Sequence, residues 1–235
     1  MTQFSDDLYL GAADGPQAQS PSAFGRGVGP LGRVFIFDVV PVALSATAVC
    51  AVQASTGTNN ALLINGASAT GGVATLDVCR ALSMIGTNAG DTTQSVTVTG
   101  TDYYGRRQTE TRTLNGTTIV NFLKAFKTVT GVTVSATLAG NISVGSRDAI
   151  GLPYRVTDIG YIQSVKWNNT LAQDAGTVVV ADTNTATATT GDVRGTYLPS
   201  SATNGSRRLV MTIALPAIAA GPDATTTGAI GVTPA

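Results

Sequence analysis

Few residues of this 235-residue chain could carry out chemistry, because the chain contains no histidine. Histidine is the commonest general acid or base near neutral pH, the usual zinc ligand, and the base that activates serine or cysteine nucleophiles. Glu110 is the only glutamate, and no spacing among the scattered aspartates pairs two carboxylates for glycoside hydrolysis. The sequence therefore predicts no catalytic residue and no enzyme activity.

Two short motifs contain parts of known ligand-binding loops. Asp182-x-Asn184 offers oxygen ligands of the kind that calcium prefers, but it lacks the glycine and the distal glutamate of an EF-hand loop. Gly25-x-Gly27-x-Gly29 precedes an apolar segment, whereas phosphate-binding loops follow a strand and open a helix. We interpret the glycines as a linker and expect neither a metal site nor a cofactor.

Some residues could contact a partner molecule without taking part in catalysis. Tyr103, Tyr104, Arg106 and Arg107 surround Gly105 at a predicted hairpin tip. Charges at such a tip are commonly only solvated, but they could also meet an acidic neighbouring surface, and the tyrosines could stack on a partner. We name these four as candidate exposed contacts, with simple solvation as the alternative.

Cys50 and Cys79 lie 29 positions apart, each in a segment with strand character. Free cysteine packs as a small hydrophobic residue, so two buried thiols are the favoured interpretation. A disulfide between them is the alternative, although two cysteines in a chain of this length do not make a disulfide scaffold.

The composition argues against charged partners. Charged residues make up only 12% of the chain, with 14 basic and 14 acidic side chains and a formal net charge of zero. We therefore expect no nucleic-acid partner and no binding to an anionic membrane. A weakly charged surface favours association, so a homo-oligomer is expected. The longest apolar run, residues 34–49, is interrupted by Asp38, Pro41 and Ser45, which argues against a transmembrane span.

The elements that must position these residues are β-strands. Residues 95–136 alternate small β-branched side chains in the manner of antiparallel strands, and turn signals stand at Tyr104-Gly105 and Asn115-Gly116. Further strands are expected in the segments 31–42, 73–82, 177–181, 193–198 and 207–216. Strands at this spacing predict an all-β fold, an antiparallel β-sandwich or jelly roll.

The two ends of the chain have a different composition from the centre. Residues 1–30 and 216–235 are rich in proline, glycine and alanine, and we expect extended N- and C-terminal arms around a core of residues 31–215. A division of that core into two subdomains near 140–150 is an alternative. Phe4, Leu8, Tyr9 and Leu10 are the expected anchors of the first arm, on a neighbouring subunit or on the chain's own core.

Residues 75–136 resemble a pattern found in virion structural proteins of tailed bacteriophages. In that pattern a strand ending in Val-x-Arg precedes VTVTGTD-x-x-G, then TET-x-x-LNGT and KAFKTV. The matching positions are Val78, Arg80, 96–102, Gly105, 109–111, 114–117 and 124–129. Cys79 stands where a proline is expected. Similar proteins decorate or cement capsids, or form parts of necks and tails.

The resemblance implies a non-enzymatic capsid decoration or cement protein on the virion surface, assembled in the host cytoplasm. Its expected partners are the major capsid protein and copies of itself, with a trimer favoured. The N-terminal sequence lacks the basic start and apolar stretch of a secretory signal, which agrees with cytoplasmic assembly. The alternatives are a neck, tail or baseplate subunit, and a carbohydrate- or receptor-binding sandwich that uses Tyr103, Tyr104, Tyr197 and Trp167.

Overall fold

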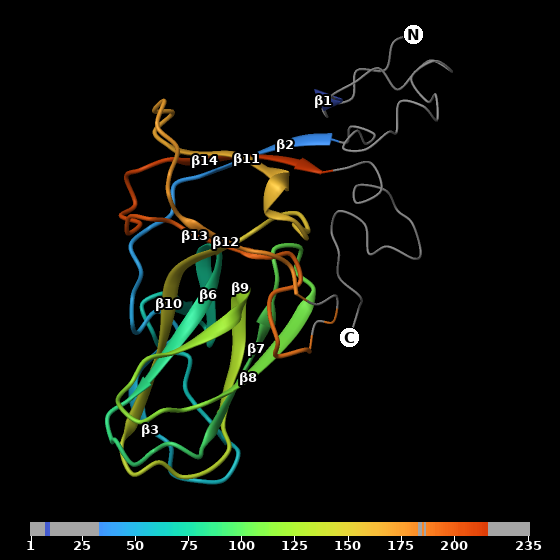
Figure 1. The fold of residues 1–235 in the computed structure, drawn as a ribbon. Helices are drawn as coiled ribbons and strands as arrows, with labels where there is room; N and C mark the ends of the chain where they lie inside the picture. Colours follow the sequence, from blue (N-terminus) through green and yellow to red (C-terminus); the bar gives the residue numbers. More distant parts are fainter. Residues whose placement is uncertain (1–7, 10–32, 183–184, 186, 216–235) are drawn as a thin grey trace.

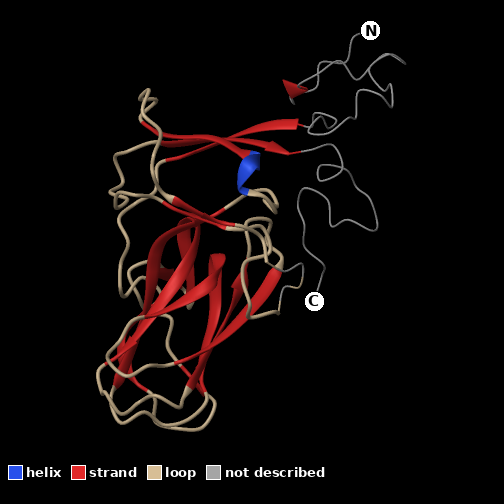
Figure 2. Cartoon of the chain, viewed as in Figure 1, coloured by secondary structure: helices blue, strands red, loops and turns tan. Residues whose placement is uncertain are grey.

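The computed structural model describes residues 8–9, 33–182, 185 and 187–215, and this part of the chain is built almost entirely of antiparallel β-strands (Figure 1). It contains no α-helix among these residues, only the short 3-10 helix η2 (Figure 2). The predicted all-β, sandwich-like class is therefore confirmed.

The elements have the following bounds, in chain order: β1 Leu8–Tyr9, β2 Arg33–Val39, β3 Cys50–Ala54, β4 Asn60–Ala61, β5 Ala69–Thr70, β6 Val73–Gly86, β7 Ser95–Thr101, β8 Arg107–Thr113, β9 Val120–Val134, β10 Asn141–Gly151, η2 Ile159–Tyr161, β11 Ile162–Trp167, β12 Thr177–Val179, β13 Thr196–Leu198 and β14 Leu209–Leu215.

The smaller sheet has four strands in the order β1-β2-β14-β11. β2 and β14 pair over their full length, with Phe37 opposite Met211 and Phe35 opposite Ile213. Because successive side chains of a strand point to opposite faces, this register places the large apolar side chains together on the inner face. Pro41 follows the end of β2, where a proline costs no ladder hydrogen bond.

The larger sheet has ten strands, seven of them in the order β12-β13-β10-β6-β9-β7-β8. It curls into a half-barrel below the smaller sheet, as Figure 1 shows. The segment 62–68 helps to close it: the amide of Leu62 donates to the Val132 carbonyl of β9, and the amide of Gly66 donates to the Val49 carbonyl beside β3.

Two apolar clusters fill the molecule. The first lies inside the curled sheet and includes Leu82, Val98, Phe122, Phe126 and Val144. The second lies between the smaller sheet and the strands beneath it, and its buried members are Phe37, Val78, Ile150, Leu152, Val156, Val165, Tyr197, Leu209, Met211, Ile213 and Leu215. Both β6 and β10 contribute to both clusters, and in β10 the change falls between Val144 and Ile150.

The alternation expected along residues 73–82 holds only for the first half of β6. Ala74 and Leu76 are buried while Thr75 and Asp77 are exposed, but the next five residues, 78–82, are all buried. The pairing of β6 with β9 also shifts register in this region. Cys79 is therefore buried, although it was expected to share a face with Thr75 and Asp77. The second cluster covers a face that solvent would otherwise reach.

Cys50 and Cys79 are both free and buried, which confirms the favoured interpretation of two buried thiols. The Cys79 thiol donates to the Ala125 carbonyl of β9 at 3.1 Å. Burial raises the pKa of Cys50 to about 12, and burial is also the main reason why the pKa of Cys79 is raised. Neither thiol has the electropositive, accessible surroundings of a reactive cysteine.

The arms lie mostly outside the described residues, as do Phe4 and Leu10. Leu8–Tyr9 form β1, which pairs with β2 of the same chain through Leu8 opposite Val34 and Tyr9 opposite Arg33. Both described ends of the core, at β2 and β14, are therefore neighbouring strands of the smaller sheet.

Candidate functional site

The tip of the β7–β8 hairpin brings together the four predicted contact residues. The Asp102 carboxylate Oδ1 accepts the backbone amides of Tyr104 and Arg106 at 2.9 and 2.8 Å, which fixes the turn. Gly105 has a φ of 76°, a left-handed conformation that glycine adopts without strain. Tyr103, Tyr104, Arg106 and Arg107 are all exposed at this tip.

The core of the chain holds Tyr104 in place. Its hydroxyl donates to the Pro153 carbonyl at 2.8 Å, and the Arg194 guanidinium lies 5.2 Å from its ring centroid. Burial is the main reason why the pKa of Tyr104 is raised to about 12. Arg194 also forms a 2.7 Å ion pair with Asp102, so the hairpin is tied to the segment before β13. The tip is consequently held against the rest of the chain through Tyr104 and Asp102.

A group of buried charged residues lies behind this hairpin, and sequence analysis did not single it out. Glu110 accepts the backbone amides of Leu123 and Lys124, and the Lys124 ammonium donates to the Thr185 carbonyl at 3.2 Å. Burial raises the pKa of Glu110 and lowers the pKa of Lys124. Asp192 accepts the amides of Ala125, Arg194 and Gly195. One feature of the sequence could have indicated this group: Lys124 stands between Phe122 and Phe126, so a charged residue shares a strand face with two apolar ones.

Four of the five charged residues at the matched positions of residues 75–136 are buried and serve the fold. Arg80, Asp102, Glu110 and Lys124 are each exposed by 1% or less. Their hydrogen bonds and ion pairs go to strands and loops of the same chain. These four charged residues therefore hold the strands and loops of the curled sheet to one another.

The outer face of the smaller sheet carries an exposed aliphatic residue. In the β2–β14 ladder Ile36 pairs with Thr212 and Val34 pairs with Ala214 on that face, and Ile36 is 71% exposed. The chain continues from β2 with three further exposed aliphatic residues, Val40, Val42 and Leu44. We call residues Ile36, Val40, Val42 and Leu44 the aliphatic stripe. Figure 1 shows the backbone of the segment that follows β2 running from the smaller sheet down one side of the molecule.

The aromatic residues named for carbohydrate binding do not share one open surface. Tyr197 is only 1% exposed, and its hydroxyl bonds to the Asp174 carboxylate. Trp167 is partly buried against the second cluster, with the Arg207 guanidinium 4.7 Å from its ring centroid. Only Tyr103 and Tyr104 remain available for stacking, at the hairpin tip.

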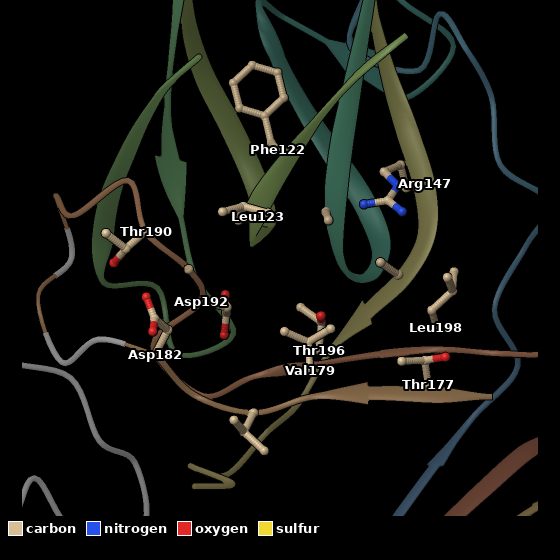
Figure 3. Close-up of a pocket in the computed structure, with 14 residues that line it drawn as sticks. Phe122, Leu123, Arg147, Thr177, Val179, Asp182, Thr190, Asp192, Thr196 and Leu198 are labelled. Carbon is tan, nitrogen blue, oxygen red and sulfur yellow. The ribbon is translucent and has the colours of Figure 1, made fainter.

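A pocket of about 350 Å³ opens where β6, β9 and β10 face β12 and β13, the last strands of the same sheet (Figure 3). Its walls are mainly apolar and include Phe122, Leu123, Val179 and Leu198. Arg147 of β10 lines one side, and Figure 3 shows Asp182 and Asp192 on the opposite side. No residue of this pocket was predicted from the sequence as a binding residue.

Within the described part of the chain no three His, Cys, Asp or Glu side chains gather in a way that could hold a metal ion. The same residues include no helix with the length and apolar character needed to cross a membrane. Asn184 of the Asp182-x-Asn184 motif lies outside the described residues.

The chain was compared with protein families, with curated proteins and with solved structures. No protein family matches the chain, and neither the curated proteins nor the solved structures include a match.

Proposed function

We propose that this chain is a non-enzymatic structural subunit of a tailed-bacteriophage virion, a decoration or cement protein of the capsid surface. The observation that carries the proposal is the aliphatic stripe, together with the resemblance of residues 75–136 to phage virion proteins. Ile36 is 71% exposed, and Val40, Val42 and Leu44 are each about half exposed, at 48%, 48% and 50%. A run of exposed aliphatic residues on one connected segment is typical of an interaction surface.

The mechanism is burial of surface by many copies. Each square ångström of apolar surface removed from water contributes about 25 cal/mol, less the cost of ordering the groups involved. A rigid support reduces that cost, and the smaller sheet provides one because β2 is hydrogen-bonded to β14 along its length. Copies tied to one lattice and to each other dissociate slowly, because every contact must be lost together. Such contacts would oppose the outward pressure of packaged DNA.

A binding experiment with a matched variant tests this function. Ile36→Asp places a charge on the outer face of the smaller sheet, whereas Ile119→Asp changes the same residue type, 60% exposed, in the turn before β9. Co-sedimentation with capsid shells that lack the protein should show saturable binding of the unchanged chain. We expect at least tenfold weaker binding for Ile36→Asp and little change for Ile119→Asp.

Two further measurements separate the outcomes. Circular dichroism of both variants must show the folded spectrum of the unchanged protein, so that loss of binding is not loss of fold. Light scattering of the unchanged protein should give the mass of an oligomer, with a trimer expected. The proposal would be refuted if the protein is monomeric and does not bind capsid shells that lack it. Saturable binding to tail or neck assemblies alone would instead favour the alternative of a tail or neck subunit.

A further inference from the structure

Arg147 is the basic side chain that lines the apolar pocket, and its guanidinium makes no hydrogen bond or ion pair with any described residue. It is half-buried on β10, on the same side of the pocket as Leu198 (Figure 3). Burial lowers its pKa, and the charge of the neighbouring Asp148 acts in the opposite direction. A guanidinium that has lost part of its water in this way usually has an anionic partner, so this half-buried arginine calls for an explanation.

The carboxylates near Arg147 are already engaged elsewhere. Asp148, its neighbour in sequence, accepts hydrogen bonds from Arg80 and Thr203 on the other side of β10. Asp192 lines the same pocket, but its two oxygens accept three backbone amides. Neither one can turn to Arg147 without leaving a buried donor unpaired, at a cost larger than the gain.

We propose that this pocket binds a small amphiphilic monocarboxylate, with the carboxylate on Arg147 and the apolar part against Phe122, Leu123, Val179 and Leu198. A guanidinium pairs with a carboxylate through two parallel hydrogen bonds, and apolar walls complete a site of the usual kind, a few polar groups in an apolar pocket. The ligand should carry a single negative charge. Asp182 and Asp192 lie across the pocket from Arg147 and would repel a dianion such as a phosphate monoester.

The size of the pocket limits the ligand. A volume of about 350 Å³ lies at the lower end of the range for small-molecule sites. An eight-carbon fatty acid, with ten non-hydrogen atoms, is a suitable probe. For so small a ligand we expect a dissociation constant on the order of 0.1–1 mM.

Titration of the full chain with octanoate, followed by NMR, tests the site. Octanoate should shift the methyl resonances of Val179 and Leu198 saturably, while octanol and octylammonium should bind at least tenfold more weakly. Arg147→Gln should weaken octanoate binding at least tenfold, and Arg147→Lys should weaken it less because the charge is kept. Arg112→Gln removes a guanidinium of similar exposure outside the pocket and should leave the binding unchanged.

Three results would overturn the proposal. Equal binding of octanoate to the Arg147→Gln variant would mean that the guanidinium does not hold the carboxylate. Equal binding of octanol would reduce the site to an unspecific apolar pocket. Shifts confined to residues outside the pocket would place the ligand elsewhere. Arg147→Gln should remain folded, since the replaced guanidinium has no partner in the described chain, and its spectrum without ligand checks this.

Discussion

Arg80 is the largest fully buried side chain of the described residues, and it joins segments that lie far apart in the sequence. Its guanidinium donates to the Asp77 carboxylate at 2.8 Å, to Asp148 at 3.4 Å, and to the Val42 carbonyl. These bonds connect β6, β10 and the segment after β2. A buried charge of this kind specifies one arrangement of strands, because any other arrangement leaves it without partners.

Asp77→Asn tests the role of this charge pair. Burial alone would raise the pKa of Asp77, but the hydrogen bonds from Arg80 and from the Val42 amide together hold it below its ordinary value. The change should lower the free energy of unfolding at pH 7 by about 2 kcal/mol, less than for a fully buried pair because the Asp77 side chain is 20% exposed. Denaturant titrations at pH 7 and pH 2.5 provide the measurement.

The sign of the pH dependence follows from the lowered pKa. The carboxylate contributes its full stabilisation above the unfolded-state pKa of about 3.9, and this contribution is lost as the pH falls through the folded-state pKa. The difference between Asp77→Asn and the unchanged protein should therefore shrink at pH 2.5. A difference that is equal at both pH values would contradict the assignment. Asp182→Asn, at an exposed carboxylate, serves as the control with little effect at either pH.

At the scale of elements, the ladder between β7 and β9 depends on a close backbone approach at Gly100. The register shifts between Thr99 and Gly100, and a Cβ built on Gly100 would lie 2.0 Å from the Thr128 carbonyl oxygen. No side chain fits there unless the two strands separate. This irregularity bends the curled sheet at the position where β7 crosses the first apolar cluster.

Gly100→Ala should therefore destabilise the protein by about 3 kcal/mol, because the strands must move apart to accommodate one methyl group. Gly57→Ala is the matched control: no heavy atom lies within 4 Å of its added Cβ, and the expected change is within about 0.5 kcal/mol. Chemical denaturation of both variants measures the difference. Equal stability of the two would mean that the strands are not as close at Gly100 as described.

At the scale of the whole molecule, the two apolar clusters are connected by the same strands. β6 carries Val78 in the second cluster and Leu82 in the first, and β10 carries Ile150 and Val144 in the same way. A substitution that destabilises one cluster should therefore also destabilise the other, because both clusters share these strands. The sheets should accordingly unfold together.

The variant Leu82→Ala tests whether the two clusters unfold together. The residue is fully buried in the first cluster, so the change should cost about 3 kcal/mol. Trp167, the only tryptophan, packs against the second cluster and reports on it by fluorescence, while far-ultraviolet circular dichroism reports on both sheets. The two midpoints should coincide and shift together in the variant. A fluorescence midpoint that does not move would show that the clusters unfold separately.

The strands of the central region could be predicted from the sequence. The alternation in residues 95–136 predicts β7, β8 and β9, and the turns expected at Gly105 and Gly116 are observed with φ values of 76° and 57°. These features are local, because side chains of a strand alternate wherever it lies and glycine tolerates a positive φ in any fold.

The sequence by itself determined the strand pattern, the turns and the exposed hairpin tip of Tyr103 and Arg106, because each depends on the backbone geometry of neighbouring residues. Only the tertiary structure decided that Arg80 and Lys124 are buried, and that Arg147 lines a pocket without a partner in the described chain. Whether a charge is buried depends on which distant segments cover the second face of its strand. That coverage is set by the packing of the two sheets, which no local pattern of residues encodes.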